Sequence, residues 1–223
     1  MDFKNANELL ALCEEKNLPV SEIMRIREIE LGETDAEVVN QKMTRVLEIM
    51  KDAALSPISQ PVKSMGGLIG GEARKLSLHA QKKEGLCGDL LQKAVTYAMA
   101  TLETNASMGL IVASPTAGSA GIVPGLMLAM QEHYHFSDAE IIQALFNASA
   151  IGYLAMRNAT VAGAVGGCQA EVGIASAMAA SAAVELLGGT PLQCTYAAST
   201  VLMNMLGLVC DPVGGLVEYP CQN

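Results

Sequence analysis

The chain has 223 residues, which is enough for one large domain, or for one domain with a small appendage. Half of it is hydrophobic (51%), but only 4% is aromatic and it contains no Trp, which favours closely packed helices over a β-sandwich. The net charge of -9 argues against a nucleic-acid partner, because a phosphate-binding surface needs clustered Lys and Arg.

Charged side chains are unevenly distributed. Residues 1–103 hold 29 of the 37 charged side chains. Residues 104–223 hold the other 8, of which only Arg157 is basic. So few charges cannot easily cover the second half with solvated surface, which leaves membrane insertion, a protein partner or a buried catalytic core. Gly and Pro interrupt both long uncharged runs, so membrane insertion is the weakest of the three. The N-terminus lacks the pattern of a signal peptide, and we expect a cytoplasmic protein that associates with itself or with another chain.

The charged first half is typical of amphipathic helices. Helices are expected over residues 21–31, with Ser21 as cap, and over residues 34–55, opened by a capping box of Thr34 and Glu37.

A glycine-rich loop is expected from Pro57 to about Glu72. It contains the pairs Gly66-Gly67 and Gly70-Gly71, which suit a ligand approaching the main chain. The same composition also suits a plain flexible linker, and the sequence leaves both readings open.

The next helix is expected over residues 89–103, and the segment 107–125 follows it. This segment carries hydroxyls and free peptide N–H groups before a helix that begins near Pro124, a combination suited to holding a carboxylate or phosphate. A buried loop between two core helices explains the composition equally well.

Three further helices are expected in the second half, over residues 137–156, 168–187 and 190–208. Ser137 and Glu140 form the capping box of the first, and small residues dominate the second. The predicted architecture is all-α, a single helical domain with glycine-rich loops that converge on a site.

Six cysteines without an export signal do not indicate a disulfide framework. Three of them lie in or beside ordinary helical sequence, where a free cysteine usually behaves as a small buried hydrophobe: Cys13, Cys87 and Cys194.

The other three cysteines, Cys168, Cys210 and Cys221, adjoin residues that turn the chain. Cys168 also begins a helix, and a helix N-terminus favours the thiolate that binds metals. The spacing is not that of a CxxC knuckle, so on spacing alone a shared metal site competes with scattered structural cysteines.

Three blocks of sequence resemble the α subunit of iron–sulfur-dependent L-serine dehydratase. They are residues 114–125 (SPTAGSAGIVPG), 166–173 (GGCQAEVG) and 207–221 (GLVCDPVGGLVEYPC). The resemblance covers nearly the whole chain, and the three blocks occur in the same order as in the family.

The resemblance implies a [4Fe-4S] cluster held by Cys168, Cys210 and Cys221, with one iron free of protein thiolate. Such an iron acts as a Lewis acid on the hydroxyl of L-serine, and the reaction gives pyruvate and ammonia without pyridoxal phosphate. The resemblance also implies a set of substrate-binding residues, for each of which a structural turn role stays open: Ser64, Gly67, Thr116, Gly118, Ser119 and Asn158.

The general base stays unassigned, with an alkoxide on the iron or a side chain of the partner subunit as the alternatives. Three residues that often serve as bases lie outside the matched blocks and are read as surface residues: His79, His133 and His135.

The family continues beyond the last cluster cysteine, so we expect a chain shortened at its C-terminus. Residues 1–223 are read as one catalytic domain, with an amphipathic part over 1–56 and a cluster- and substrate-binding core over 57–223. A separate β subunit, a homo-oligomer or both are expected as partners, with neither nucleic acid nor membrane.

Three alternatives to serine dehydration remain. The glycine-rich loop reads Gly-Gly-Leu-Ile-Gly-Gly where the family has Thr-Gly-Leu-Thr-Gly-Gly, which leaves open a related lyase acting on cysteine or another β-substituted amino acid. The others are a non-catalytic helical chain without a cluster and, more weakly, a zinc-bound structural domain.

Overall fold

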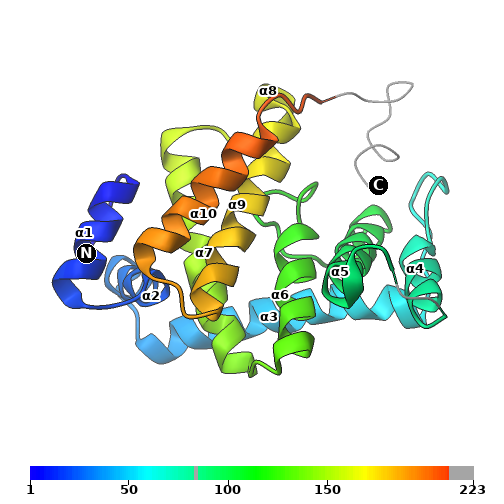
Figure 1. The fold of residues 1–223 in the computed structure, drawn as a ribbon, viewed down its shortest axis with the longest axis horizontal. Helices are drawn as coiled ribbons and strands as arrows, with labels where there is room; N and C mark the ends of the chain where they lie inside the picture. Colours follow the sequence, from blue (N-terminus) through cyan, green and yellow to red (C-terminus); the bar gives the residue numbers. More distant parts are fainter. Residues whose placement is uncertain (83–84, 211–223) are drawn as a thin grey trace. The chain divides into compact units, whose positions relative to one another are not determined.

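The computed structural model describes residues 1–82 and 85–210, and all regular structure in this part of the chain is helical (Figure 1). The all-α prediction is therefore confirmed. The chain divides into two compact units. Among the described residues, the first comprises Met1–Leu47 and Ser137–Leu208, and the second comprises Glu48–Phe136 with Val209 and Cys210. The expected functional subdivision at residue 56 stays a prediction.

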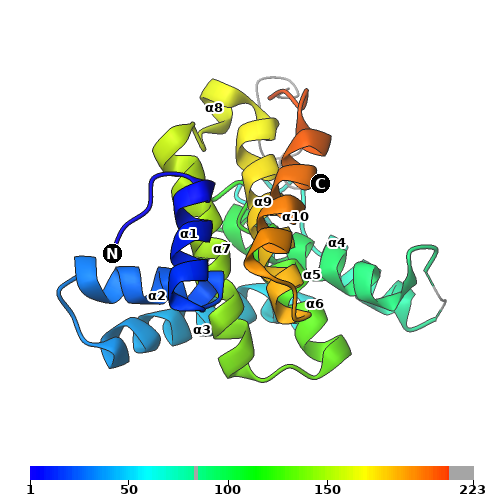
Figure 2. The same ribbon diagram turned by 60° about the vertical axis from the view of Figure 1, so that its left-hand side comes forward.

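The first unit is a helical bundle. Its helices are α1 (Ala6–Lys16), α2 (Val20–Leu31), the first part of α3 (Ala36–Ser59), α7 (Asp138–Asn158), α8 (Gly163–Gly166), α9 (Cys168–Leu186) and α10 (Pro191–Met205). Helix α9 packs against both α7 and α10, and the three lie side by side in Figures 1 and 2. Among the described helices, α7 alone is long and apolar enough to cross a membrane, but half of that apolar stretch is buried inside the protein, as in a core helix.

Small side chains allow the close packing of α9. Ala175, Ala179 and Ala182 are buried on one side of the helix, and a Cβ at Gly173 would lie 3.2 Å from the Cβ of Met205 on α10.

Capping boxes formed by neighbouring residues open two of these helices. They stand at Ser137, which begins α7 as predicted, and at Thr190, which begins α10.

The N-terminal segment contributes to the core of the first unit. Phe3, Leu9 and Ile23 are fully buried and pack in one cluster with Cys194 and other apolar residues. The segment thus belongs to the packed unit and is not a loose extension.

The second unit is built around α5 (Gly88–Ala106), which packs against α4 (Glu72–Ala80) and α6 (Ile122–Tyr134). Two glycines of the block 114–125 make the second contact possible. A Cβ at Gly125 would lie 2.7 Å from the carbonyl oxygen of Ala94 on α5, and a Cβ at Gly121 would overlap the carbonyl of Ala98. The motif glycines therefore serve helix packing.

Helix α3 runs through Pro57, where a loop was expected to begin, and ends at Ser59. Proline has no N–H for the carbonyl of residue 53, four positions earlier, and usually ends a helix for that reason. Here the hydroxyl of Thr104 on α5 donates to the carbonyl oxygen of Ala53 at 2.9 Å. A side chain from another helix supplies the missing donor, so the helix continues.

Two further boundaries differ from the prediction. Ser21 does not cap α2, because the helix begins one residue earlier, after Pro19; instead the Ser21 N–H donates to Glu185 at 3.3 Å. Helix α10 ends at Met205 rather than near residue 208. No helix range was predicted for α1, α4 or α8.

Candidate functional site

The glycine-rich loop, residues 60–71 in the structure, is closed by its own hydrogen bonds. The Ser64 N–H donates to the Ile69 carbonyl at 3.0 Å, and the Ile69 N–H donates to the Ser64 hydroxyl at 3.3 Å. Gly67 has a φ of +73°, a conformation that favours glycine. Ser64 is buried, so its hydroxyl supports the turn, and Gly67 lies at an exposed position within it.

A second loop, residues 114–119, is called the hydroxyl loop here. The hydroxyls of Thr116 and Ser119 are 3.1 Å apart and hydrogen bonded, and Gly118 lies half-buried between them. The Ser114 hydroxyl is buried and has no hydrogen-bond partner among the described residues.

Both loops are attached to the C-terminal turn of α5. The Met65 N–H of the glycine-rich loop donates to the Ala106 carbonyl at 2.9 Å. The Asn105 side chain donates to the Ala117 carbonyl of the hydroxyl loop at 3.1 Å. Two of the loops that the resemblance assigns to the substrate are thus attached to one helical turn of the second unit, and their convergence on a substrate site stays a prediction.

Sequence reasoning missed the α5 turn that holds the two loops. Ala106 contributes only a carbonyl, which leaves no trace in the sequence. Glu103 does leave a trace in the sequence. It follows the buried residues Thr96 and Ala100 at helical spacing, so its carboxylate falls on the buried side of α5.

Asn158 lies in the first unit, at the end of α7. Its amide nitrogen donates to the carbonyls of Lys4 and Leu154, at 2.8 and 2.9 Å. One amide proton therefore holds the N-terminal segment and the other bonds within α7, so only the amide oxygen remains for a substrate.

Cys168 begins α9 and is half-buried. The next residue, Gln169, donates its N–H to the Leu208 carbonyl at 3.0 Å, and its side-chain oxygen accepts from the Gly207 N–H at 2.9 Å. Cys210 follows Leu208 by two residues, so the Cα atoms of these two lie within about 7 Å of each other. Gln169 thus fastens the start of the Cys168 helix to the segment that leads to Cys210.

Cys210 itself is exposed. Cys221 lies outside the described residues, so the predicted three-cysteine site stays a prediction. Within residues 1–82 and 85–210, no group of three or more His, Cys, Asp or Glu is placed to hold a metal ion.

The remaining cysteines divide differently from the prediction. Cys13 and Cys194 are buried, and burial raises the pKa of their thiols to about 12 and about 11. Cys87 is exposed, because it precedes α5 at the end of a turn instead of facing the core. The prediction that Cys87 is buried was therefore wrong. The three histidines are exposed, as predicted.

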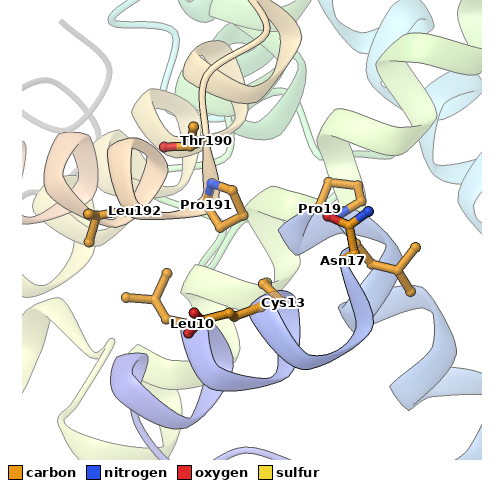
Figure 3. A pocket seen from close by; sticks show the side chains of 9 residues that line it. Leu10, Cys13, Asn17, Pro19, Thr190, Pro191 and Leu192 are labelled. Atoms are coloured by element: carbon orange, nitrogen blue, oxygen red, sulfur yellow. The ribbon is translucent and has the colours of Figure 1, made fainter.

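A cavity of about 590 Å³ lies in the first unit between α1 and the turn before α10 (Figure 3). Its walls are mainly apolar, with Leu10, Cys13 and Leu192 among the lining residues. The candidate site residues that the structure describes do not line it.

Comparison with known proteins identifies the class of chain to which these motifs belong. Residues 15–223 match the family Serine dehydratase alpha chain. The chain is 47% identical to the probable L-serine dehydratase, alpha chain, of Bacillus subtilis, over 98% of this chain and 73% of that one. It is 42% identical to the L-serine dehydratase, alpha chain, of Peptoniphilus asaccharolyticus, over 98% of this chain and 75% of that one.

Longer relatives match over a smaller part of their own length. The chain is 36% identical to the L-serine dehydratase of Helicobacter pylori, but it covers only 49% of that protein. The family match and the identities together give a plain result: this chain belongs to the serine dehydratase alpha chain family, as its motifs predicted.

Proposed function

We propose that this chain is the α subunit of a cytoplasmic, iron–sulfur-dependent L-serine dehydratase that converts L-serine to pyruvate and ammonia. The observation that carries the proposal is the near-complete match to two proteins named as alpha chains of L-serine dehydratase. The joining of two candidate substrate loops at the end of α5 supports it.

Two of the three cysteines that would hold a [4Fe-4S] cluster lie in the described part of the chain, and the setting of Cys168 supports the proposal. Cys168 stands at a helix N-terminus, where the partial positive charge favours a thiolate, and Gln169 ties that helix to the Cys210 segment. Cys168, Cys210 and Cys221 would hold the cluster. When bound, the cluster supplies a Lewis acid that makes the substrate hydroxyl a better leaving group.

The chain's own contribution is to bind and orient the amino acid. The Thr116 hydroxyl, which is hydrogen bonded to the buried Ser119 hydroxyl, would turn its proton to the serine carboxylate, and α6 begins only three residues after Ser119. A carboxylate there is favoured by the helix dipole. Positioned in this way, the Cα–H and the Cβ hydroxyl of the substrate are both fixed relative to the loops.

A separate β chain is part of the proposal. The relatives named as alpha chains imply a second kind of subunit. The longer L-serine dehydratases, of which this chain covers about half, carry additional sequence in the same polypeptide. The charge-poor second half of this chain is where we expect contact with the β chain, because its few charges leave much surface to be covered.

The test is anaerobic purification and cluster reconstitution, with and without the β chain, followed by an absorption spectrum and a pyruvate assay. We expect a brown protein that releases pyruvate from serine faster than from cysteine. A preference for cysteine would instead support a related lyase. A colourless protein that releases no pyruvate after reconstitution would support a non-catalytic helical chain. If that protein contains zinc, the result would support a zinc-bound structural domain.

A further inference from the structure

The last turn of α5 holds four different segments of the second unit through four consecutive residues. Thr104 and Asn105 use side chains, donating to Ala53 of α3 and to Ala117 of the hydroxyl loop. Ala106 accepts from Met65 in the middle of the glycine-rich loop. The fourth residue, Glu103, acts at the end of that loop.

Glu103 supplies the cap that α4 lacks. Helix α4 begins after Gly71, which has no side chain to cap it and a φ of +91°. The Glu103 carboxylate reaches across from α5, and its Oε1 accepts the Ala73 N–H at 2.9 Å. Glu103 and Ala106, one helical turn apart, therefore fix the two ends of the segment between Met65 and Ala73.

The cap that Glu103 supplies also has a cost. Glu103 is only 4% exposed, and its Oε2 has no hydrogen-bond partner among the described residues. Burial raises its pKa above the ordinary value, while the backbone N–H groups of Ala73, Gly71 and Glu72 act in the opposite direction. A buried carboxylate with one oxygen unsatisfied is costly, so stability alone does not explain the residue.

We propose that Glu103 is a positioning residue for the substrate site: its carboxylate holds the glycine-rich loop, through the start of α4, in the form that receives the amino acid. The inference rests on the proposed function, because it assigns the loop to substrate. Glu103 does not itself touch the substrate, and it acts through the backbone of Gly71 to Ala73.

The experiment compares Glu103→Ala and Glu103→Gln with wild type in the reconstituted enzyme with its β chain. Glu132→Gln is the matched control: Glu132 also lies in the second unit and accepts a hydrogen bond, from Tyr97 at 2.6 Å, but it is remote from both loops in sequence. Serine KM, kcat, iron content, thermal midpoint and the amide hydrogen exchange of residues 70–75 are measured for each.

We expect Glu103→Ala to raise the serine KM about tenfold, with kcat changed less than about threefold, because a hydrogen bond to a charged group is lost. Glu103→Gln keeps an acceptor at Oε1, so its KM rises less, by about threefold. Amide exchange over residues 70–75 is faster in Glu103→Ala, and its thermal midpoint falls because the buried Ala73 N–H loses its acceptor, while the iron content stays at the wild-type value. The control matches wild type throughout.

Two results would overturn the inference. One is unchanged amide exchange in Glu103→Ala. The other is a serine KM that rises equally in Glu103→Gln and Glu103→Ala, which would show that the acceptor at Oε1 does not position the loop. If wild type itself releases no pyruvate from serine, the proposed function fails, and the exchange measurement still tests whether Glu103 holds the loop.

Discussion

The hydroxyl of Thr104 donates to the main-chain carbonyl of Ala53 at 2.9 Å, which is shorter than its 3.2 Å contact with Ala100 in its own helix. The Ala53 carbonyl is the one that Pro57 cannot satisfy within α3. A proline in one helix and a threonine in another thus form a matched pair. This pairing links α3 to the same turn of α5 that holds the candidate substrate loops.

Thr104→Val should destabilise the protein by about 1–3 kcal/mol, because it keeps the shape of the side chain but leaves a carbonyl without a donor. In a Pro57→Ala background the restored N–H can donate to Ala53, so the same substitution should cost less. Chemical denaturation of the four proteins measures the coupling. Equal costs in both backgrounds would show that the two residues act independently.

Gly125→Ala should destabilise the protein by about 1–3 kcal/mol, although alanine favours helix more than glycine does. The new Cβ would lie 2.7 Å from the backbone oxygen of Ala94, which cannot move aside cheaply. Gly152→Ala is the control, since its Cβ would meet only the flexible end of Met178 at 3.1 Å. We expect this control to change thermal stability little. A Gly125→Ala variant as stable as wild type would contradict the packing role of the motif glycine.

Gln169→Leu should weaken cluster retention without unfolding the chain. The variant loses the side-chain oxygen that accepts the Gly207 N–H, so of the two hydrogen bonds from Gln169 to this segment the main-chain bond to Leu208 remains. We expect faster iron release to a chelator than in wild type, with a similar thermal midpoint for the apo chains. Gln143→Leu, on the exposed side of α7, should behave as wild type. Equal iron-release rates for both variants would show that Gln169 does not help to retain the cluster.

The N-terminal segment should loosen in acid. Arg27 donates to the Asp2 carboxylate at 2.7 Å, and this hydrogen bond lowers the pKa of Asp2. A carboxyl whose pKa is lower in the folded state stabilises it above the unfolded pKa of about 3.9. This contribution is lost as pH falls through the folded value. Asp2→Asn should therefore lower the thermal midpoint at pH 7, and the difference from wild type should shrink below about pH 4. A difference that stays constant with pH would rule out the ionised pair as its source.

Features set by neighbouring residues could be predicted from the sequence. The Ser137 capping box and the small-residue helix that starts at Cys168 depend on patterns within one or two turns, and the structure has both. The family blocks identified the loop that carries Thr116 and Ser119. They did so without indicating what holds it.

Features that depend on distant partners could not be predicted. Pro57 indicates a helix end unless one knows that Thr104 reaches its freed carbonyl. The α5 turn acts partly through the Ala106 carbonyl, which every residue type possesses. Cys87 was expected to be buried because free cysteines usually are, but it is exposed because it lies in a turn.

The most direct test of the account is the iron and acid-labile sulfide content of anaerobically reconstituted cysteine variants. Wild type, Cys13→Ala and Cys194→Ala should each bind about four iron and four sulfide per chain, as one cubane cluster requires. Cys168→Ala, Cys210→Ala and Cys221→Ala should lose the brown colour. Full iron content in one of these three, or its loss in Cys13→Ala or Cys194→Ala with the fold intact, would contradict the assignment.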